Sequence, residues 1–238
     1  MAQTLNLINL PDGRVVNETN HDPAIPRVTG YDRFWLSADL GQANDFTAIV
    51  GIRDKQFPTV DGGRVVLGPR ERTIVYADRF RGVSYVDVVD HLIRLKNAQP
   101  FTGKTDLCID ASSLGRVVSD QLTEQNCPHL AIQMVAGQNW VRKGKYVNAA
   151  KSLIIEALSV MFASGELTFA KDLPLRQEIE EDLASFQLTT TAAGNQIITQ
   201  SRNASGHGDL GVSLAICAFA SQYLKPQRME VGHLKGYY

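Results

Sequence analysis

The stretch that decides the fold is residues 34–52, FWLSADLGQANDFTAIVGI. Its first part is a short apolar run that ends at Asp39, and Gly41 and a polar turn follow. Its last part, from Thr47 to Ile52, is rich in residues that favour strands. Two such runs separated by turn residues predict an antiparallel hairpin whose first strand ends in a carboxylate.

The same pattern, a buried strand that ends in an aspartate, returns at residues 106–110, DLCID. Hydrophobic periodicity and turn residues predict the remaining elements. These are strands at 64–67, 72–77 and 130–135, helices at 86–95, 116–125, 146–164, 175–186 and 209–223, and a hairpin over 187–200. The order predicts an α/β fold, with an antiparallel β-meander followed by parallel strands in one mixed central sheet flanked by helices.

The ends of the chain do not show sustained periodicity. We therefore predict an extended N-terminal arm or linker over residues 1–30, one domain over 31–225 and a flexible C-terminal tail over 226–238.

The composition limits the class of protein. The chain of 238 residues is 44% hydrophobic and 21% charged, which is ordinary for a globular protein. A net charge of −1 means that any binding of nucleic acid needs local basic patches. Three isolated cysteines favour a reducing, cytoplasmic compartment over a disulfide framework or structural zinc. No apolar run is long enough to span a bilayer, so we expect no membrane partner.

Three aspartates stand where predicted elements begin or end. Asp39 and Asp110 close strands, Asp209 opens the last helix, and Asp45 follows Asp39 across the hairpin turn. Carboxyl ends of strands gather at one edge of an open α/β sheet, so these side chains are expected to meet there. Clustered carboxylates repel one another unless hard divalent cations such as Mg²⁺ or Mn²⁺ lie between them. Taken singly, each aspartate also fits turn, strand-end or helix-cap chemistry.

Three segments together resemble the nuclease motifs of phage terminase large subunits, the proteins that package and cut viral DNA. The first is residues 36–50, LSADLGQANDFTAIV, the second is 108–118, CIDASSLGRVV, and the third is 207–215, HGDLGVSLA. A segment from Lys151 to Phe186 is similar to the family's long helix and the acidic helix after it. The resemblance covers residues 34–224, with the three motifs in order.

This resemblance implies an RNase H-like nuclease that cuts double-stranded DNA with two divalent cations, Mg²⁺ or Mn²⁺. It implies Asp39, Asp110 and Asp209 as catalytic metal ligands, and Asp45 as an auxiliary ligand or a group just outside the ligand set. His207 would assist proton transfer, or be a turn residue. The implied partners are a motor ATPase domain or chain, a small terminase subunit and the portal, in the cytoplasm of the host cell. The family's P-loop motif, GxxxxGK[ST], does not occur in these 238 residues.

Basic residues gather beside Trp140, between Gly137 and Gly144. A glycine-flanked basic loop near a metal site would be a phosphate clamp, and a solvated loop is the alternative. The residues predicted to contact DNA are Arg142, Lys143, Lys145 and Lys151.

Other functions remain open at this point. A Holliday-junction resolvase or another RNase H-like nuclease would share the metal chemistry and differ in substrate. A sugar-kinase or actin-like ATPase would need a second phosphate loop, for which residues 111–115, ASSLG, are a poor candidate. A non-catalytic packaging scaffold would carry the acidic residues without using them.

Overall fold

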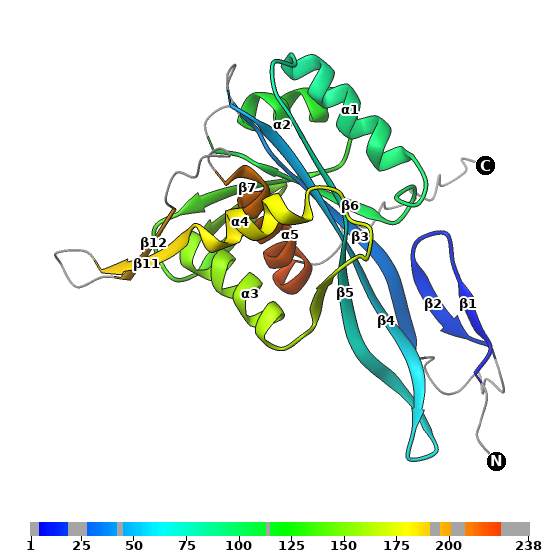
Figure 1. Cartoon of the computed structure of the whole chain (residues 1–238). Coiled ribbons are helices and arrows are strands. Elements are labelled where there is room, and N and C mark those ends of the chain that lie inside the picture. The colour runs from blue at the N-terminus through cyan, green and yellow to red at the C-terminus, as the bar shows by residue number, and fades with distance from the viewer. Residues whose placement is uncertain are drawn as a thin grey trace, which may run out of the picture.

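The computed structural model describes residues 5–18, 28–41, 45–112, 115–190, 196–200 and 208–224, with the backbone alone for 187–190 and 196–200. Within these residues, a ten-stranded sheet carries helices on both faces (Figure 1). The strand order is β10-β5-β4-β3-β6-β7-β9-β8, and β2 pairs with β3 in addition. The predicted fold class, a mixed central sheet flanked by helices, is confirmed.

The antiparallel half of the sheet is a meander of three long strands. These are β3 (Thr29–Asp39), β4 (Thr47–Asp61) and β5 (Arg64–Phe80). A tight turn joins β4 to β5, and both of its glycines, Gly62 and Gly63, have positive φ angles of 54° and 76°, as such hairpin turns require. The sequence predicted two short strands where β5 runs unbroken. The pairing shifts between Gln56 and Pro58, and this irregularity accommodates a proline inside a strand.

The parallel half adds strands on the other side of β3. The strand β6 (Thr105–Asp110) lies parallel to β3, β7 (Leu130–Val135) lies parallel to β6, and β9 (Tyr146–Ala150) lies parallel to β7. The edge strand β8 (Trp140–Lys143) is antiparallel to β9, and β10 (Leu167–Phe169) is parallel to β5 at the opposite edge. A separate pair, β11 (Phe186–Thr190) and β12 (Gln196–Gln200), forms the predicted hairpin.

The helices cover the two faces of the sheet. The helices α1 (Tyr85–Asn97) and α2 (Gly115–Glu124) pack on one face, against a core that includes Leu36 and Ile109. The other face carries α3 (Lys151–Ala163), α4 (Arg176–Ala184) and α5 (Asp209–Tyr223), packed against Trp35 and its neighbours (Figure 1). Almost every residue of α5 is buried, so this helix is apolar on all sides and lies in the interior.

Two expectations about the middle of the chain were wrong. Residues 146–150 were predicted as the start of a long helix, but they form β9, because they pair with β7, and α3 begins only at Lys151. The basic segment before them was predicted as a loop, and it forms β8, which pairs with β9. An edge strand with exposed side chains carries no apolar alternation, so the sequence gives no sign of it.

The described part of the predicted N-terminal arm contains β1 (Leu7–Asn9) and β2 (Arg14–Asn17). This hairpin extends the sheet along the first part of β3, and Val15 within it is buried. The domain bounds stay a prediction, and residues 226–238 lie outside the described residues. Among the helices that the structure describes, none is long and apolar enough to cross a membrane.

Candidate metal centre

Asp39 and Asp110 end two neighbouring parallel strands. In the register of β3 and β6, Ala38 pairs with Ile109, so the two aspartates are the next residues along each strand. Side chains alternate between the faces of a sheet, and Ala38 and Ile109 belong to the core under α1 and α2. The two aspartates therefore point to the opposite face, toward α5. The sequence-based prediction that these carboxylates converge agrees with this topology.

Asp209 is the first residue of α5, on that same face. Gly208 precedes it with a φ of 76°, a left-handed conformation that a glycine adopts without strain. The helix is fixed against β3, because the hydroxyls of Ser37 and Ser213 lie 2.7 Å apart and Ser213 donates to the carbonyl of Ser37 at 2.9 Å. Ser37 lies two residues before Asp39, so this contact sets the position of α5 relative to the strand end.

The carboxylates share one electrostatic field. Burial raises the pKa of Asp39 well above its usual value, and the charges of Asp110, Asp209 and Asp182 raise it further. The backbone N–H of Leu40 acts in the opposite sense. Carboxylates from β6, α4 and α5 therefore lie close enough to Asp39, at the end of β3, to act on its ionisation.

The side chain of Asp110 is oriented by the turn that follows β6. Burial raises its pKa, and hydrogen bonds from Ser112 partly oppose that effect. The backbone N–H of Ser112 donates to Oδ1 of Asp110 at 2.9 Å. This bond fixes the carboxylate at the end of β6, so that part of its hydrogen-bonding capacity is used by the protein itself.

Asp182, the acidic residue that α4 contributes, was not predicted from the sequence. Its side chain is 1% exposed, and Oδ2 accepts the backbone N–H groups of Leu210 and Gly211 at 3.0 and 3.2 Å. A usable signal exists in the sequence. Asp182 follows the buried Ile179 by three residues, which puts it on the inward face of an otherwise acidic helix.

Two further candidates, Asp45 and His207, were predicted for this site. Asp45 lies just before β4, at the same end of the β3–β4 hairpin as Asp39, and its part in the site stays a prediction. His207 lies outside the described residues.

The basic residues that were predicted to contact DNA fall in different surroundings. Arg142 and Lys143 are exposed on β8, and Arg142 lies in the cross-strand row of Asp110, which runs through β7 and β9. Three strand spacings separate them, about 14 Å. The ammonium of Lys145 instead donates to Thr123 of α2 at 2.6 Å. Lys151 is the first residue of α3.

A second basic pair, Arg79 and Arg81 on and just after β5, lies nearer to the acids. In the sheet, Asp39 pairs with Ala48 and Ala48 pairs with Arg79, so Arg79 is two strands from Asp39, about 10 Å. The guanidinium carbons of Arg79 and Arg81 lie 4.6 and 5.2 Å from the centroid of the Phe46 ring. Arg79 also lowers the pKa of Asp182, although burial, the larger effect, raises it.

The donor set of this site consists of hard oxygen ligands. Among the described residues, no three His, Cys, Asp or Glu side chains come close enough to hold one ion directly. These carboxylates lie near one another, but no three of them point at one position. Such an arrangement suits a small, hard cation that keeps several of its water ligands. The residues present therefore suit Mg²⁺ or Mn²⁺ better than a softer metal.

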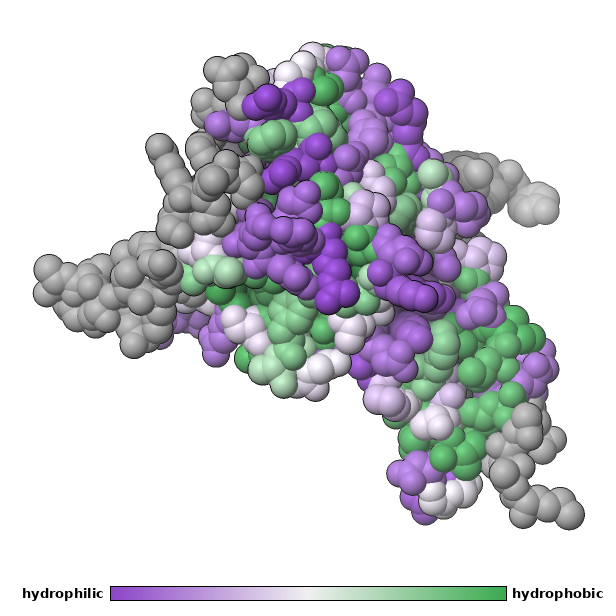
Figure 2. Space-filling view, viewed as in Figure 1, coloured by the Kyte–Doolittle hydropathy of each residue, from purple (hydrophilic) through white to green (hydrophobic). Residues whose placement is uncertain are grey.

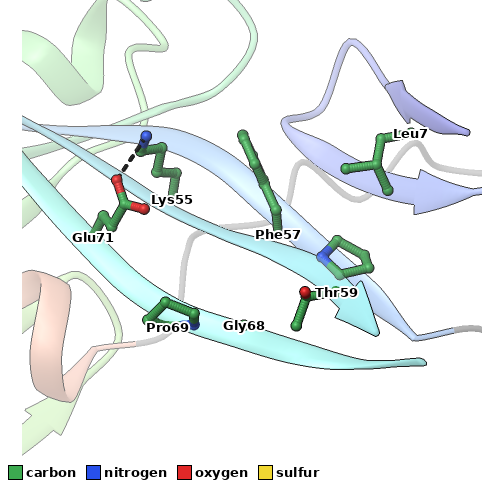
Figure 3. A pocket seen from close by; sticks show the side chains of 8 residues that line it. Leu7, Lys55, Phe57, Thr59, Gly68, Pro69 and Glu71 are labelled. Atoms are coloured by element: carbon green, nitrogen blue, oxygen red, sulfur yellow. Dashed lines mark ion pairs between the residues drawn. The ribbon is translucent and has the colours of Figure 1, made fainter. Parts of the chain in front are cut away.

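A hollow of about 250 Å³ lies far from these acids, on the outer part of the β4–β5 hairpin beside Leu7. Lys55 and Glu71 form an ion pair of 2.8 Å on its wall, among side chains that are mostly apolar or small (Figure 3). Apolar surface gathers over this end of the molecule (Figure 2). The hollow brings together no group of acids or bases suited to catalysis.

Comparisons with known proteins identify the fold. The sequence matches no family model, and no curated protein matches it closely enough to count as a relative. Solved structures do match. The large terminase nuclease of the thermophilic phage G20c superposes in its magnesium-bound form with a TM-score of 0.52 at 19% identity, covering 87% of this chain and 86% of that one. Its cobalt-bound form gives 0.54 at 19% identity, with the same coverage.

The large terminase nuclease domain of Thermus phage P74-26 gives 0.51 at 20% identity, covering 86% of this chain and 84% of that one. The chain therefore has the fold of phage large terminase nuclease domains, as the sequence motifs predicted. At these identities, the likeness concerns the fold, and the chemistry of the site has to be argued from its residues.

Proposed function

We propose that the protein is a metal-dependent DNA endonuclease of the terminase large subunit type. The observation that carries this proposal is the meeting of Asp39 and Asp110 at neighbouring strand ends that face the start of α5. The fold supports a nuclease role in DNA packaging. The G20c nuclease has been solved with bound magnesium and with bound cobalt, which supports a divalent cation here as well.

The cation site would be held by Asp39, Asp110 and Asp209, with Asp45 as an auxiliary group. Two divalent cations, Mg²⁺ or Mn²⁺, would supply Lewis acidity to both the attacking and the leaving oxygen of a phosphodiester. Burial and neighbouring charges raise the pKa of Asp39, so a bound cation would stabilise its ionised carboxylate. His207 remains a candidate for proton transfer at this site.

The substrate would be double-stranded DNA, held through its phosphates. Arg142 and Lys143 present exposed cations on β8, and the partly buried Lys151 adds a cation at the start of α3. Lys145 belongs to the predicted set, although its bonds to α2 leave it less available. Contacts of this kind position DNA without reading its sequence. On the other side of Asp39, Arg79 and Arg81 would add to the same electrostatic attraction.

The partners and compartment follow from the same proposal. A terminase nuclease would act beside a motor ATPase, with a small terminase subunit and the portal, in the cytoplasm of the infected host. A resolvase-like nuclease would use the same cation site on branched DNA, and a scaffold would not cut DNA at all.

The test is cleavage of supercoiled plasmid by the wild type and by Asp110→Asn, each with Mn²⁺, with Mg²⁺ and with EDTA. We expect nicking and linearisation that need a divalent cation and are lost in the variant. Exposed Glu180→Gln on α4 is the control, and it should cut like the wild type. Cleavage that persists in EDTA, or in Asp110→Asn, would contradict the proposal, and preference for four-way junctions over plasmid would favour the resolvase.

A further inference from the structure

The carboxylate of Asp182 is an unusual group for the interior of a protein. It is 1% exposed, and only one of its two oxygens has protein partners among the described residues. Oδ2 accepts two backbone N–H groups from the first turn of α5, whereas Oδ1 has no hydrogen-bond partner there. Buried polar atoms in folded proteins are nearly always paired, so an oxygen of this kind requires a partner such as a water or an ion.

Burial raises the pKa of this carboxylate, and the groups around it partly oppose that effect. Its Oδ2 accepts from Leu210 and Gly211 at the N-terminus of α5, where backbone dipoles stabilise negative charge. The positive charge of Arg79 also lowers the pKa of Asp182. An ionised carboxylate that is removed from water needs a counter-charge near its second oxygen as well.

The packing of α4 against α5 holds Asp182 in this position. A Cβ atom added at Gly211 would lie 3.1 Å from Cβ of Asp182 and 3.1 Å from a ring carbon of Phe186. The absence of a side chain at Gly211 therefore lets the two helices approach closely enough for the Oδ2 bonds. The same approach brings Asp182 close enough to Asp39 to raise the pKa of Asp39.

We propose that Asp182 is a fourth acidic member of the cation site: Oδ2 fixes the start of α5, and with it Asp209, while Oδ1 faces the water shell of a bound divalent cation. The inference rests on the proposed function, because it assumes that a cation occupies the acidic cluster. Contact through a water shell agrees with the arrangement of the described carboxylates, no three of which close on one point.

Asp182→Asn separates the two roles of this side chain. Its amide oxygen can still accept from Leu210 and Gly211, and its NH₂ group takes the place of Oδ1. The variant removes a negative charge from a repulsive cluster, so in EDTA it should melt at or above the temperature of the wild type. Its affinity for Mn²⁺, measured by calorimetry without DNA, should fall by about 10–100-fold, as for other groups that support a metal site.

Two control variants make the outcomes distinct. Glu180→Gln, on the exposed side of α4, should bind Mn²⁺ like the wild type, and Asp110→Asn should lose binding. If Asp182→Asn binds Mn²⁺ within about twofold of the wild type while Asp110→Asn does not, the role of Asp182 is refuted and the proposed function stands. If the wild type takes up no Mn²⁺, both are refuted. Should the asparagine variant fail to fold, Asp182→Ser carries the same expectation.

Discussion

A buried ion cluster between β3, β4 and β5 leads to a prediction about stability. Asp54 is fully buried and accepts hydrogen bonds from Arg70 at 2.8 and 2.7 Å and from Arg33 at 3.2 and 3.1 Å. Arg72, also buried, lies 3.9 Å from Asp54 and pairs with Glu166. Burial opposes the ionisation of Asp54, but these arginines outweigh it and hold its pKa below the usual value.

The substitution Asp54→Ala leaves three guanidinium groups with Glu166 as their acidic partner in this cluster. Removal of one partner of a buried ion pair costs about 3–5 kcal/mol, because the remaining charge stays away from water. In a protein of this size, each kcal/mol lowers the melting temperature by about 2–4 °C, so we expect a fall of roughly 6–20 °C. Calorimetric melting or urea titration would measure it.

The matched control lies on the same pair of strands. Glu71 forms a 2.8 Å ion pair with Lys55, but its side chain is 59% exposed, so Glu71→Ala should cost no more than about 1 kcal/mol. If the two alanine variants lost stability equally, the reasoning about the buried cluster would be refuted. The cluster also holds the C-terminal end of α5, because Arg70 donates to the carbonyl of Ser221, so its loss should loosen this helix.

Three further predictions concern pH, DNA and the core. The raised pKa values of Asp39 and Asp110 mean that the unfolded chain releases these protons first, so the metal-free protein should lose stability as pH rises above about 4. Mn²⁺ should reverse this loss at neutral pH. Melting temperatures measured across pH in EDTA and in Mn²⁺ would test this, and a melting temperature in EDTA that did not change with pH would show that the pKa shifts are absent. Arg142→Ala should weaken DNA binding and reduce the slope of log Kd against log salt concentration by about 1. Lys145→Ala should change the affinity and the slope less, because Lys145 is bonded to α2. Equal effects of the two variants in salt titrations would contradict this difference. Phe219→Ala, at a fully buried ring of α5, should cost about 3–5 kcal/mol in urea unfolding, and a loss below about 1 would contradict the packing.

The sequence was sufficient to locate the two strand ends and the helix start that carry the candidate acids. Strands that end in Asp39 and Asp110 can be recognised from the local sequence. Because the carboxyl ends of strands gather at one edge of an open α/β sheet, the two aspartates are then expected to lie near each other. The start of α5 at Asp209 was predicted for a similar reason, because a long apolar run begins there. These features depend on short-range patterns, which survive in a single sequence.

The features that were missed depend on contacts between distant residues. Asp182 belongs to the site only because Gly211 lets α4 approach α5, and the acidic residues around it suggest a solvated helix face. The buried charge of Asp54 is compensated by arginines from two other strands. The strand β8 exists because β9 offers it a partner. No local pattern encodes such partners, so they required the fold.

The central claim is that Asp39, Asp110 and Asp209 hold divalent cations. It is tested most directly by crystals grown with Mn²⁺ and measured at the manganese absorption edge. We expect two anomalous peaks between these three side chains, about 3.5–4 Å apart, and their loss in Asp110→Asn. Well-diffracting crystals with no peak there, at Mn²⁺ concentrations that fill other surface sites, would contradict it.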